Sequence, residues 1–314
     1  MDPIARIYKQ RDEEGRDKIR NYRKPPQRFR ASELTDCKRQ IWYRLSGYVP
    51  APRTGFDDDW SRDGDVHHDL VRALMREYGV RIAGVTFNED GTQTEDRFIV
   101  HDFDVDGRQI SVSTRQDGWI YHEDYGWILL EIKSVGHWVH KYQLDAYAGI
   151  GQREDGTDRT GGHDDLLDYI KVKKPEWIAQ CHAGMKIAQE RGVDALPFPS
   201  DEKHDLTKAY LVVKDRSNCH IGYHDDDIGV VGGVVIDFEQ ETWDKITRRL
   251  YATKGKVLDG KPPLPEYTSS SRACGYCPFR YLCHDARKRQ KNGHTPAILY
   301  PDPECGVHYD DPED

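Results

Sequence analysis

Two short runs of aromatic and β-branched residues flank a polar loop near the middle of the chain. The runs cover residues 117–121 and 127–133, and the loop between them ends in glycine. This pattern predicts a β-hairpin. If the five residues between the runs form the loop, Tyr121 pairs with Trp127, and the register of every other pair follows from that one. The rest of the fold is predicted around this hairpin.

The predicted register brings three ionisable side chains to one face of the hairpin. Asp117 lies opposite Glu131, and strand alternation puts Lys133 on the same face. The apolar residues of the second strand point the other way, toward a core: Ile128, Leu130 and Ile132. Two neighbouring carboxylates repel each other, and a divalent cation such as Mg²⁺ or Mn²⁺ is the usual compensation. The alternative is a surface hairpin with a cross-strand ion pair.

Periodicity predicts helices and further strands around the hairpin. Helices are expected at residues 32–47, 64–78, 138–148, 175–191 and 239–257, after a charged N-terminal segment that is helical in part. In the helix at 64–78, four-residue spacing predicts an apolar stripe of Val66, Leu70 and Leu74. Strands are expected at residues 80–87, 97–105, 109–115 and 208–214, with one or two more within 228–238. This order predicts a mixed α/β fold with a largely antiparallel centre.

Composition indicates a folded, soluble protein. The chain has 314 residues, of which 37% are hydrophobic and 32% charged, and this length suffices for one large domain. The longest apolar run has nine residues, from Ile228 to Ile236, far fewer than the ~20 that a membrane helix needs. The first twenty residues are charged throughout and show no signal peptide. We therefore expect a cytoplasmic protein with no membrane partner.

Charge is distributed unevenly, although the net charge is -9. Residues 1–44 contain 13 Lys or Arg against 7 Asp or Glu, and residues 272–291 contain 6 against 1. Residues 301–314 contain six acidic residues and no Lys or Arg. If the two basic segments meet in space, they can follow a phosphate backbone. The alternative is that both are ordinary solvated surfaces.

Four of the seven cysteines form a pattern. Cys274, Cys277 and Cys283 lie close together near the C-terminus, and Cys37 lies far upstream. Three clustered thiolates and one remote thiolate can complete a Cys₄ set for an iron–sulphur cluster or for Zn²⁺, and unligated cysteines are the third alternative. Either metal would join the N-terminal helix to the C-terminal loop and bring the two basic segments together. The remaining cysteines have no such spacing: Cys181, Cys219 and Cys305.

Taken in order along most of the chain, these motifs resemble the PD-(D/E)XK nuclease superfamily. Within it they are similar to RecB-like exonucleases with an iron–sulphur cluster, a group that includes the CRISPR-associated Cas-four type and the AddB-type nuclease domain. The resemblance rests on Cys37 within residues 31–37, on Gly64-Asp65-Val66-His67-His68 as a Gly-x3-His motif, on Asp117-Gly118, on Glu131-Ile132-Lys133 and on the three C-terminal cysteines.

The resemblance implies a restriction-endonuclease-like core, in which helices flank a central mixed sheet. It implies a single nuclease domain over residues 1–292, followed by an acidic tail at 293–314. Residues 31–47 and 272–291 would bind the cluster. Residues 137–175, with their Gly/Asp-rich stretch, would be an insertion.

The resemblance also implies roles for single residues. Mg²⁺ or Mn²⁺ would be bound by His68, Asp117 and Glu131, with the backbone carbonyl of Ile132 as a further ligand. Lys133 would position or deprotonate the attacking water and stabilise the charge that develops on phosphorus. A [4Fe–4S] cluster would be held by the four patterned cysteines: Cys37, Cys274, Cys277 and Cys283.

Two of these assignments stay open from the sequence alone. The helix register does not decide between His68 and His67 as the metal ligand. The family's Gln-x3-Tyr motif is matched literally by Gln143, but that residue lies in the expected insertion. Gln180 lies in a context closer to the family's, ahead of a strand, although Gly184 stands where the motif has tyrosine.

The implied activity is a metal-dependent DNA exonuclease that acts on single-stranded ends, in recombination, repair or phage DNA processing. The sequence contains no Walker A loop, so ATP-driven unwinding would need a helicase or recombinase partner. One alternative places the same chemistry in CRISPR adaptation, where the nuclease would trim spacers beside an integrase. Two others are not enzymes: a DNA-binding scaffold stabilised by the cluster, and a zinc-stapled binding module.

Overall fold

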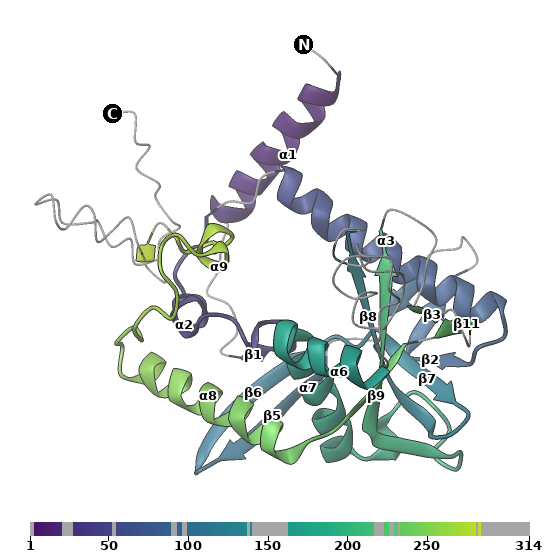
Figure 1. Ribbon diagram of the computed structural model, residues 1–314. Coiled ribbons are helices and arrows are strands. Elements are labelled where there is room, and N and C mark those ends of the chain that lie inside the picture. Colours follow the sequence, from purple (N-terminus) through teal and green to yellow (C-terminus); the bar gives the residue numbers. More distant parts are fainter. Residues whose placement is uncertain are drawn as a thin grey trace, which may run out of the picture.

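A central five-stranded sheet organises the protein, as the computed structural model shows (Figure 1). The structure describes residues 3–20, 28–51, 55–88, 93–95, 99–136, 139, 163–216, 223–225, 229–231, 233–280 and 282–283. The strand order is β12 (Val234–Asp237), β9 (His204–Asp215), β8 (Gly126–Val135), β7 (Gly118–His122) and β2 (Ile82–Ala83). Within this sheet only the β8–β9 pair is parallel. A parallel pair needs a crossover connection between its strands. The mixed sheet and the helices around it confirm the predicted mixed α/β class.

The hairpin of β7 and β8 has the predicted register. Tyr121 pairs with Trp127, and Gly118 pairs with Leu130. The loop length alone therefore located every cross-strand neighbour in this hairpin. The surface-hairpin alternative is wrong, because the residues of β8 from Gly126 to Ile132 are all buried. A strand buried on both faces is typical of the centre of a sheet that helices cover on each side.

Helix α3 (Gly55–Glu77) covers one face of the sheet. Val71 of this helix packs with Ile128, Leu130 and Ile132 of β8. The predicted apolar stripe is wrong: Val66 is 62% exposed and Leu70 is 40% exposed, whereas Val71 is fully buried. The spacing of apolar residues predicted the helix but assigned the wrong face of it to the core. Such spacing does not reveal which side of a helix meets the sheet.

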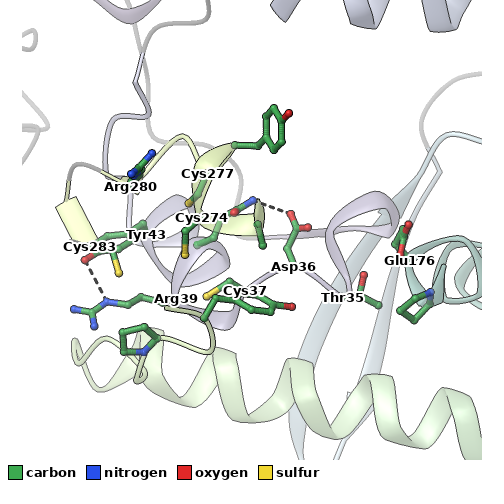
Figure 2. A pocket seen from close by; sticks show the side chains of 16 residues that line it. Thr35, Asp36, Cys37, Arg39, Tyr43, Glu176, Cys274, Cys277, Arg280 and Cys283 are labelled. Carbon is green, nitrogen blue, oxygen red and sulfur yellow. Dashed lines mark hydrogen bonds between the residues drawn. The ribbon is translucent and has the colours of Figure 1, made fainter. Parts of the chain in front are cut away.

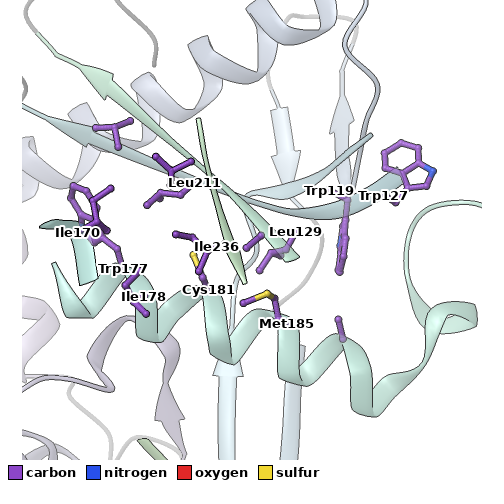
Figure 3. Close-up of a cluster of buried hydrophobic side chains, with 14 of the residues drawn as sticks. Trp119, Trp127, Leu129, Ile170, Trp177, Ile178, Cys181, Met185, Leu211 and Ile236 are labelled. Atoms are coloured by element: carbon purple, nitrogen blue, oxygen red, sulfur yellow. The ribbon is translucent and has the colours of Figure 1, made fainter. Parts of the chain in front are cut away.

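Helices α6 (His163–Lys173) and α7 (Pro175–Arg191) cover the other face. Figure 3 shows Cys181 and Met185 of α7 against Leu129, Leu211 and Ile236 of the strands. The bounds of α7 agree with the prediction, because Pro175 suits the first turn and Gly192 ends the helix. The C-terminal part of the segment set apart as an insertion is α6, whose Leu166 and Ile170 lie in this core. The helix expected at 138–148 lies outside the described residues.

A second layer packs beside the central sheet. It contains a three-stranded sheet in the order β1 (Phe29–Arg30), β6 (Arg108–Thr114) and β5 (Ile99–Val105). Helix α8 (Gln240–Leu258) and helix α2 (Lys38–Leu45) pack against it. The predicted single helix at 32–47 is wrong, because a 3₁₀ turn, η1 (Ala31–Glu33), is separated from α2 by residues 34–37. The extended ψ of 124° at Cys37 makes this residue the N-cap of α2.

The remaining elements are short or peripheral. Helix α1 (Pro3–Arg20) extends from the body of the protein (Figure 1). The small elements are β3 (Val85–Phe87), β4 (Gln93–Glu95), η3 (Val193–Ala195), β10 (Tyr223–Asp225), β11 (Gly229–Val231) and α9 (Arg272–Gly275). Within the described ranges, no helix is long and apolar enough to cross a membrane.

Candidate active site and cysteine cavity

Asp117 lies immediately before β7 and is held by three contacts. Its Oδ2 accepts a hydrogen bond from the backbone amide of Ile132 at 2.7 Å. Its Oδ1 lies 3.0 Å from His68 Nδ1 and accepts a hydrogen bond from Arg72 at 3.3 Å. The chain can turn here because the next residue is Gly118, whose φ is +142°. A Cβ atom at Gly118 would lie 3.1 Å from the backbone oxygen of Ala83, so glycine also permits the close approach of β2.

Glu131 and Lys133 lie two residues apart on β8, on the face that α7 covers. Glu131 is 2% exposed, and its Oε1 lies 2.5 Å from Lys133 Nζ. Among the described residues this oxygen has no partner in hydrogen-bond geometry. Lys133 Nζ also donates to Gln180 Oε1 at 2.8 Å. The structure therefore brings Gln180 of α7 to the Glu-x-Lys pair of the hairpin.

Burial and mutual charge set the protonation of these groups. Burial raises the pKa of Glu131 to about 7; the charge of Asp117 adds to this rise, and the Lys133 ammonium opposes it. Burial also acts to raise the pKa of Asp117, but the hydrogen bond and charge of His68, together with Lys133, outweigh it and lower that pKa. Burial acts to lower the pKa of Lys133, but the carboxylates of Glu131 and Asp117 outweigh it and raise that pKa. Lys133 is thus held as an ammonium.

Stability in the absence of metal should depend on the protonation of Glu131. A carboxyl whose pKa is raised on folding stabilises the protein below its unfolded pKa of about 4.5, and this stability is lost as the pH rises through the folded value of about 7. Between pH 5 and 8 the free energy of unfolding of wild-type protein should fall relative to that of Glu131→Gln, by on the order of 1–3 kcal/mol. Urea unfolding in EDTA at several pH values measures this difference.

Comparing wild type with Glu131→Gln also removes the contributions of other titratable groups from the difference in the free energy of unfolding. His67 and His182 have lowered pKa values, chiefly through burial, so they change stability in the opposite direction over a similar pH range. Both histidines are present in wild type and in Glu131→Gln, so their contributions to the difference in stability cancel. A difference between the two proteins that stays constant from pH 5 to 8 would contradict the raised pKa of Glu131.

The carboxylate oxygens at this site are donors that Mg²⁺ and Mn²⁺ use. Asp117 and Glu131 supply carboxylate oxygens, and His68 supplies an imidazole beside Asp117. A divalent cation would also relieve the repulsion that raises the pKa of Glu131. No three His, Cys, Asp or Glu side chains in the described part of the chain converge closely enough to hold a metal ion in this conformation. The residues therefore suit such an ion by type and charge, and binding would require their side chains to move closer together.

The structure separates the two histidine candidates. His68 contacts Asp117, whereas His67 Nε2 lies 3.4 Å from Asp63 Oδ1 on the same helix. Of the two glutamine candidates, Gln143 lies outside the described residues and Gln180 contacts Lys133. The structure explains the glycine at position 184, because a Cβ atom there would lie 2.6 Å from a methyl carbon of Leu129. A larger side chain at position 184 would therefore require Leu129 to move.

The four patterned cysteines lie around one cavity of about 380 Å³. Figure 2 shows Cys37 at the start of α2 facing Cys274, Cys277 and Cys283 from the C-terminal segment. Burial raises the pKa of the Cys277 thiol to about 11, and the three other cysteines add to the rise. Sequence spacing therefore grouped these four residues correctly across more than two hundred positions.

Aromatic and backbone contacts hold the two cysteine-bearing segments together. Tyr43 of α2 stacks on Phe279, with ring centroids 5.6 Å apart. The backbone amide of Ala51 donates to the carbonyl of Pro278 at 2.8 Å. The other described cysteine, Cys181, is fully buried in the core against the sheet, away from this cavity, and Cys219 and Cys305 lie outside the described residues.

One residue at the candidate site was missed by the sequence analysis. Arg72 is fully buried and contacts Asp117. Arg72 follows His68 by one helical turn, which places both residues on one side of α3. This spacing was the sequence signal that could have identified Arg72. A buried arginine cannot be recognised from the sequence without knowing which helix face meets the sheet.

Comparisons with known proteins give a distant likeness in structure. No family model matches the chain, and no curated protein matches it. A crystal structure of SSO0001 has 11% sequence identity and a TM-score of 0.40, covering 88% of this chain and 96% of that one. An alkaline exonuclease, LHK-Exo from Laribacter hongkongensis, has 16% identity and a TM-score of 0.39, covering 74% of this chain and 89% of that one. The same exonuclease in complex with dAMP has 15% identity and a TM-score of 0.38, covering 88% and 99%.

Proposed function

We propose that this protein is a metal-dependent DNA nuclease that hydrolyses phosphodiester bonds at its hairpin. The observation that carries the proposal is the group of Asp117, Glu131 and Lys133, in which both carboxylates are buried and burial and Asp117 raise the pKa of Glu131 to about 7. Burying two carboxylates beside an ammonium costs stability unless the arrangement serves a purpose. Perturbed carboxylates of this kind are typical of functional sites.

The roles of the residues follow from their contacts. His68, Asp117 and Glu131 would hold Mg²⁺ or Mn²⁺, with the Ile132 carbonyl as a further proposed ligand. When bound, such an ion supplies an activated water and neutralises charge on the phosphate. The Ile132 amide and His68 fix the orientation of Asp117, so the carboxylate does not have to be reoriented for catalysis.

Lys133 is proposed to act as a cation and hydrogen-bond donor. Its pKa is raised by the two carboxylates, so the ammonium is poor as a base and well suited to orient water and to stabilise negative charge on phosphorus. Gln180 accepts from Nζ, which leaves the ammonium anchored between Gln180 and Glu131. Gln180 is therefore a positioning residue in this mechanism.

DNA is the proposed substrate because the described parts of the two basic segments meet. Lys38 and Arg39 of α2 lie in the segment that packs on the C-terminal residues 277–283, and Figure 2 shows Arg39 and Arg280 beside the same cavity. Basic side chains that meet at one surface can follow a phosphate backbone. We propose single-stranded ends as the preferred substrate and an exonuclease mode of action, with any unwinding supplied by a helicase or recombinase partner.

The four cysteines are proposed to hold a structural [4Fe–4S] cluster. The four thiols are the type of ligand that an iron–sulphur cluster or Zn²⁺ takes, and they line one cavity of about 380 Å³. An arrangement around a space suits a ligand of several atoms. The cluster would join the N-terminal and C-terminal segments, and no catalytic step is assigned to it.

The test is cleavage of end-labelled single-stranded DNA with Mn²⁺, Mg²⁺ or EDTA. We expect degradation with Mn²⁺ or Mg²⁺ and none with EDTA, because the proposed site has carboxylate ligands for these ions. Closed circular single-stranded DNA is the matched control, since an exonuclease needs an end and should leave it intact. Labels at either end report the polarity of cleavage.

Two outcomes of this assay would change the proposal. Cutting of the circle would replace the exonuclease with an endonuclease that uses the same site. No cleavage by folded, metal-loaded protein would overturn the nuclease and favour a DNA-binding scaffold.

A further inference from the structure

A buried arginine contacts the carboxylate at the centre of the candidate site. Arg72 is 0% exposed. Its Nη2 donates to Asp117 Oδ1 at 3.3 Å, and its Nη1 donates to Asp69 Oδ1 at 3.0 Å. Gln93 of β4 in turn donates to the backbone oxygen of Asp69 at 2.7 Å. The guanidinium is therefore held on one side by α3 and lies against Asp117 on the other.

Arg72 adds a cation to the charged groups of the candidate site. At the candidate site the carboxylates of Asp117 and Glu131 are buried; Arg72 contacts Asp117, and Lys133 contacts Glu131. His68 also contacts Asp117. A guanidinium keeps its charge throughout the pH range in which proteins fold. Asp69 is about half exposed, so water screens much of its charge. Two of the chain's own cations thus already lie against these carboxylates.

We propose that Arg72 is a positioning residue that orients Asp117 and limits the affinity of the site for a divalent cation, so that the cation binds tightly only together with a DNA phosphate. This inference rests on the proposed function. A divalent cation would bring two positive charges next to those of Arg72 and Lys133, and such repulsion is strong in a buried site. The phosphate group of the substrate supplies the negative charge that offsets it.

The competing explanation is that Arg72 only fastens α3 to the sheet. Both explanations predict a less stable protein when Arg72 is replaced, because removing one partner of a buried ion pair leaves the other charge uncompensated. They differ in the sign of the effect on metal binding. A structural role predicts unchanged or weaker metal binding, whereas a counter-cation role predicts tighter binding.

The experiment measures Mn²⁺ binding to metal-stripped, full-length protein by titration calorimetry. Arg72→Gln removes the charge and keeps an amide that can donate to Asp117. We expect it to bind Mn²⁺ at least about tenfold more tightly than wild type in the absence of DNA, since one nearby unit charge is worth this much or more at protein dielectric values. Arg72→Lys, which retains the charge, should restore the wild-type affinity.

Substrate coupling is measured in the same titration. A phosphorothioate oligonucleotide, which keeps its backbone charge, should tighten Mn²⁺ binding to wild type by about tenfold or more and should tighten binding to Arg72→Gln much less. A methylphosphonate oligonucleotide, which has no backbone charge, should have no effect on either protein. Arg76→Met is the matched control, because Arg76 lies on the same helix but over the ring of Phe87.

The outcomes separate this inference from the proposed function. If wild type binds Mn²⁺ and Asp117→Asn abolishes the binding, the metal site stands. Unchanged or weaker binding by Arg72→Gln would then overturn the counter-cation role alone. If wild type does not bind Mn²⁺, or if Asp117→Asn binds it equally well, the metal site and the inference both fail. Should Arg72→Gln fail to fold by circular dichroism, Arg72→Met carries the same prediction for the charge.

Discussion

Replacing Lys133 by alanine should lower the rate of metal-dependent DNA cleavage by about a thousandfold or more. The ammonium is the one described cation that contacts both Glu131 and Gln180. Its loss removes the donor that is proposed to orient water and to stabilise charge on phosphorus. The rate is measured with end-labelled single-stranded DNA in Mn²⁺, under single-turnover conditions so that product release does not mask the chemical step.

The fold should survive this substitution well enough for the result to be informative. Glu131 would lose its counter-ion, but its pKa is already raised to about 7, so it can take up a proton instead of remaining a buried charge. The double variant Lys133→Met, Glu131→Gln removes both charges at once and should be at least as stable as Lys133→Ala. Both variants should be inactive, although they differ in stability.

A matched control tests whether any lysine would have this effect. Lys171 forms an ion pair with Glu239 at 2.7 Å and is partly exposed on α6. Lys171→Ala should leave the cleavage rate within about twofold of wild type, because Lys171 pairs with Glu239, which is not a proposed site residue, and a partly exposed ion pair contributes little to stability. If Lys133→Ala retains most of the activity while the fold is intact, the assignment of the hairpin as the catalytic site is wrong.

The local parts of this fold could be predicted from the sequence because their determinants are local. The loop between two β-rich runs gave the register of Tyr121 with Trp127, and Pro175 and Gly192 marked the ends of α7. The pairing of Asp117 with the Glu131–Lys133 strand follows from the same register. For these elements the chemistry of a few neighbouring residues suffices.

The parts that failed depend on tertiary contacts. Spacing alone selected Val66 and Leu70 for the core, but the sheet contacts Val71 instead. The contact between Arg72 and Asp117 joins two elements whose relative orientation no local pattern defines. The break before α2 at Cys37 was also missed, and it places that cysteine at a helix start facing the C-terminal segment. The sequence therefore identified candidate residues by their chemical type, whereas the residues that contact them became known only from the structure.

Replacing Cys277 by serine should remove the proposed cluster and lower the stability of the protein by several kcal/mol. The side chain of Cys277 is only partly buried, so exchanging sulfur for oxygen there should by itself cost about 1 kcal/mol or less. A ligand role predicts a larger loss, because the free energy of metal binding contributes directly to folding. In this protein the cluster would add to the contact between Tyr43 and Phe279, which joins α2 to the C-terminal segment.

Metal analysis of anaerobically purified protein identifies the ligand. Wild type should be brown and contain about four iron atoms and as much acid-labile sulfide per chain, whereas Cys277→Ser should lose the iron and the colour. Cys181→Ala is the matched control, since Cys181 lies in the core against the sheet, and it should keep its iron even if it is less stable. One zinc ion per chain without iron would contradict the cluster. Retention of iron by Cys277→Ser would show that this thiol is not a required ligand, whatever the loss in stability.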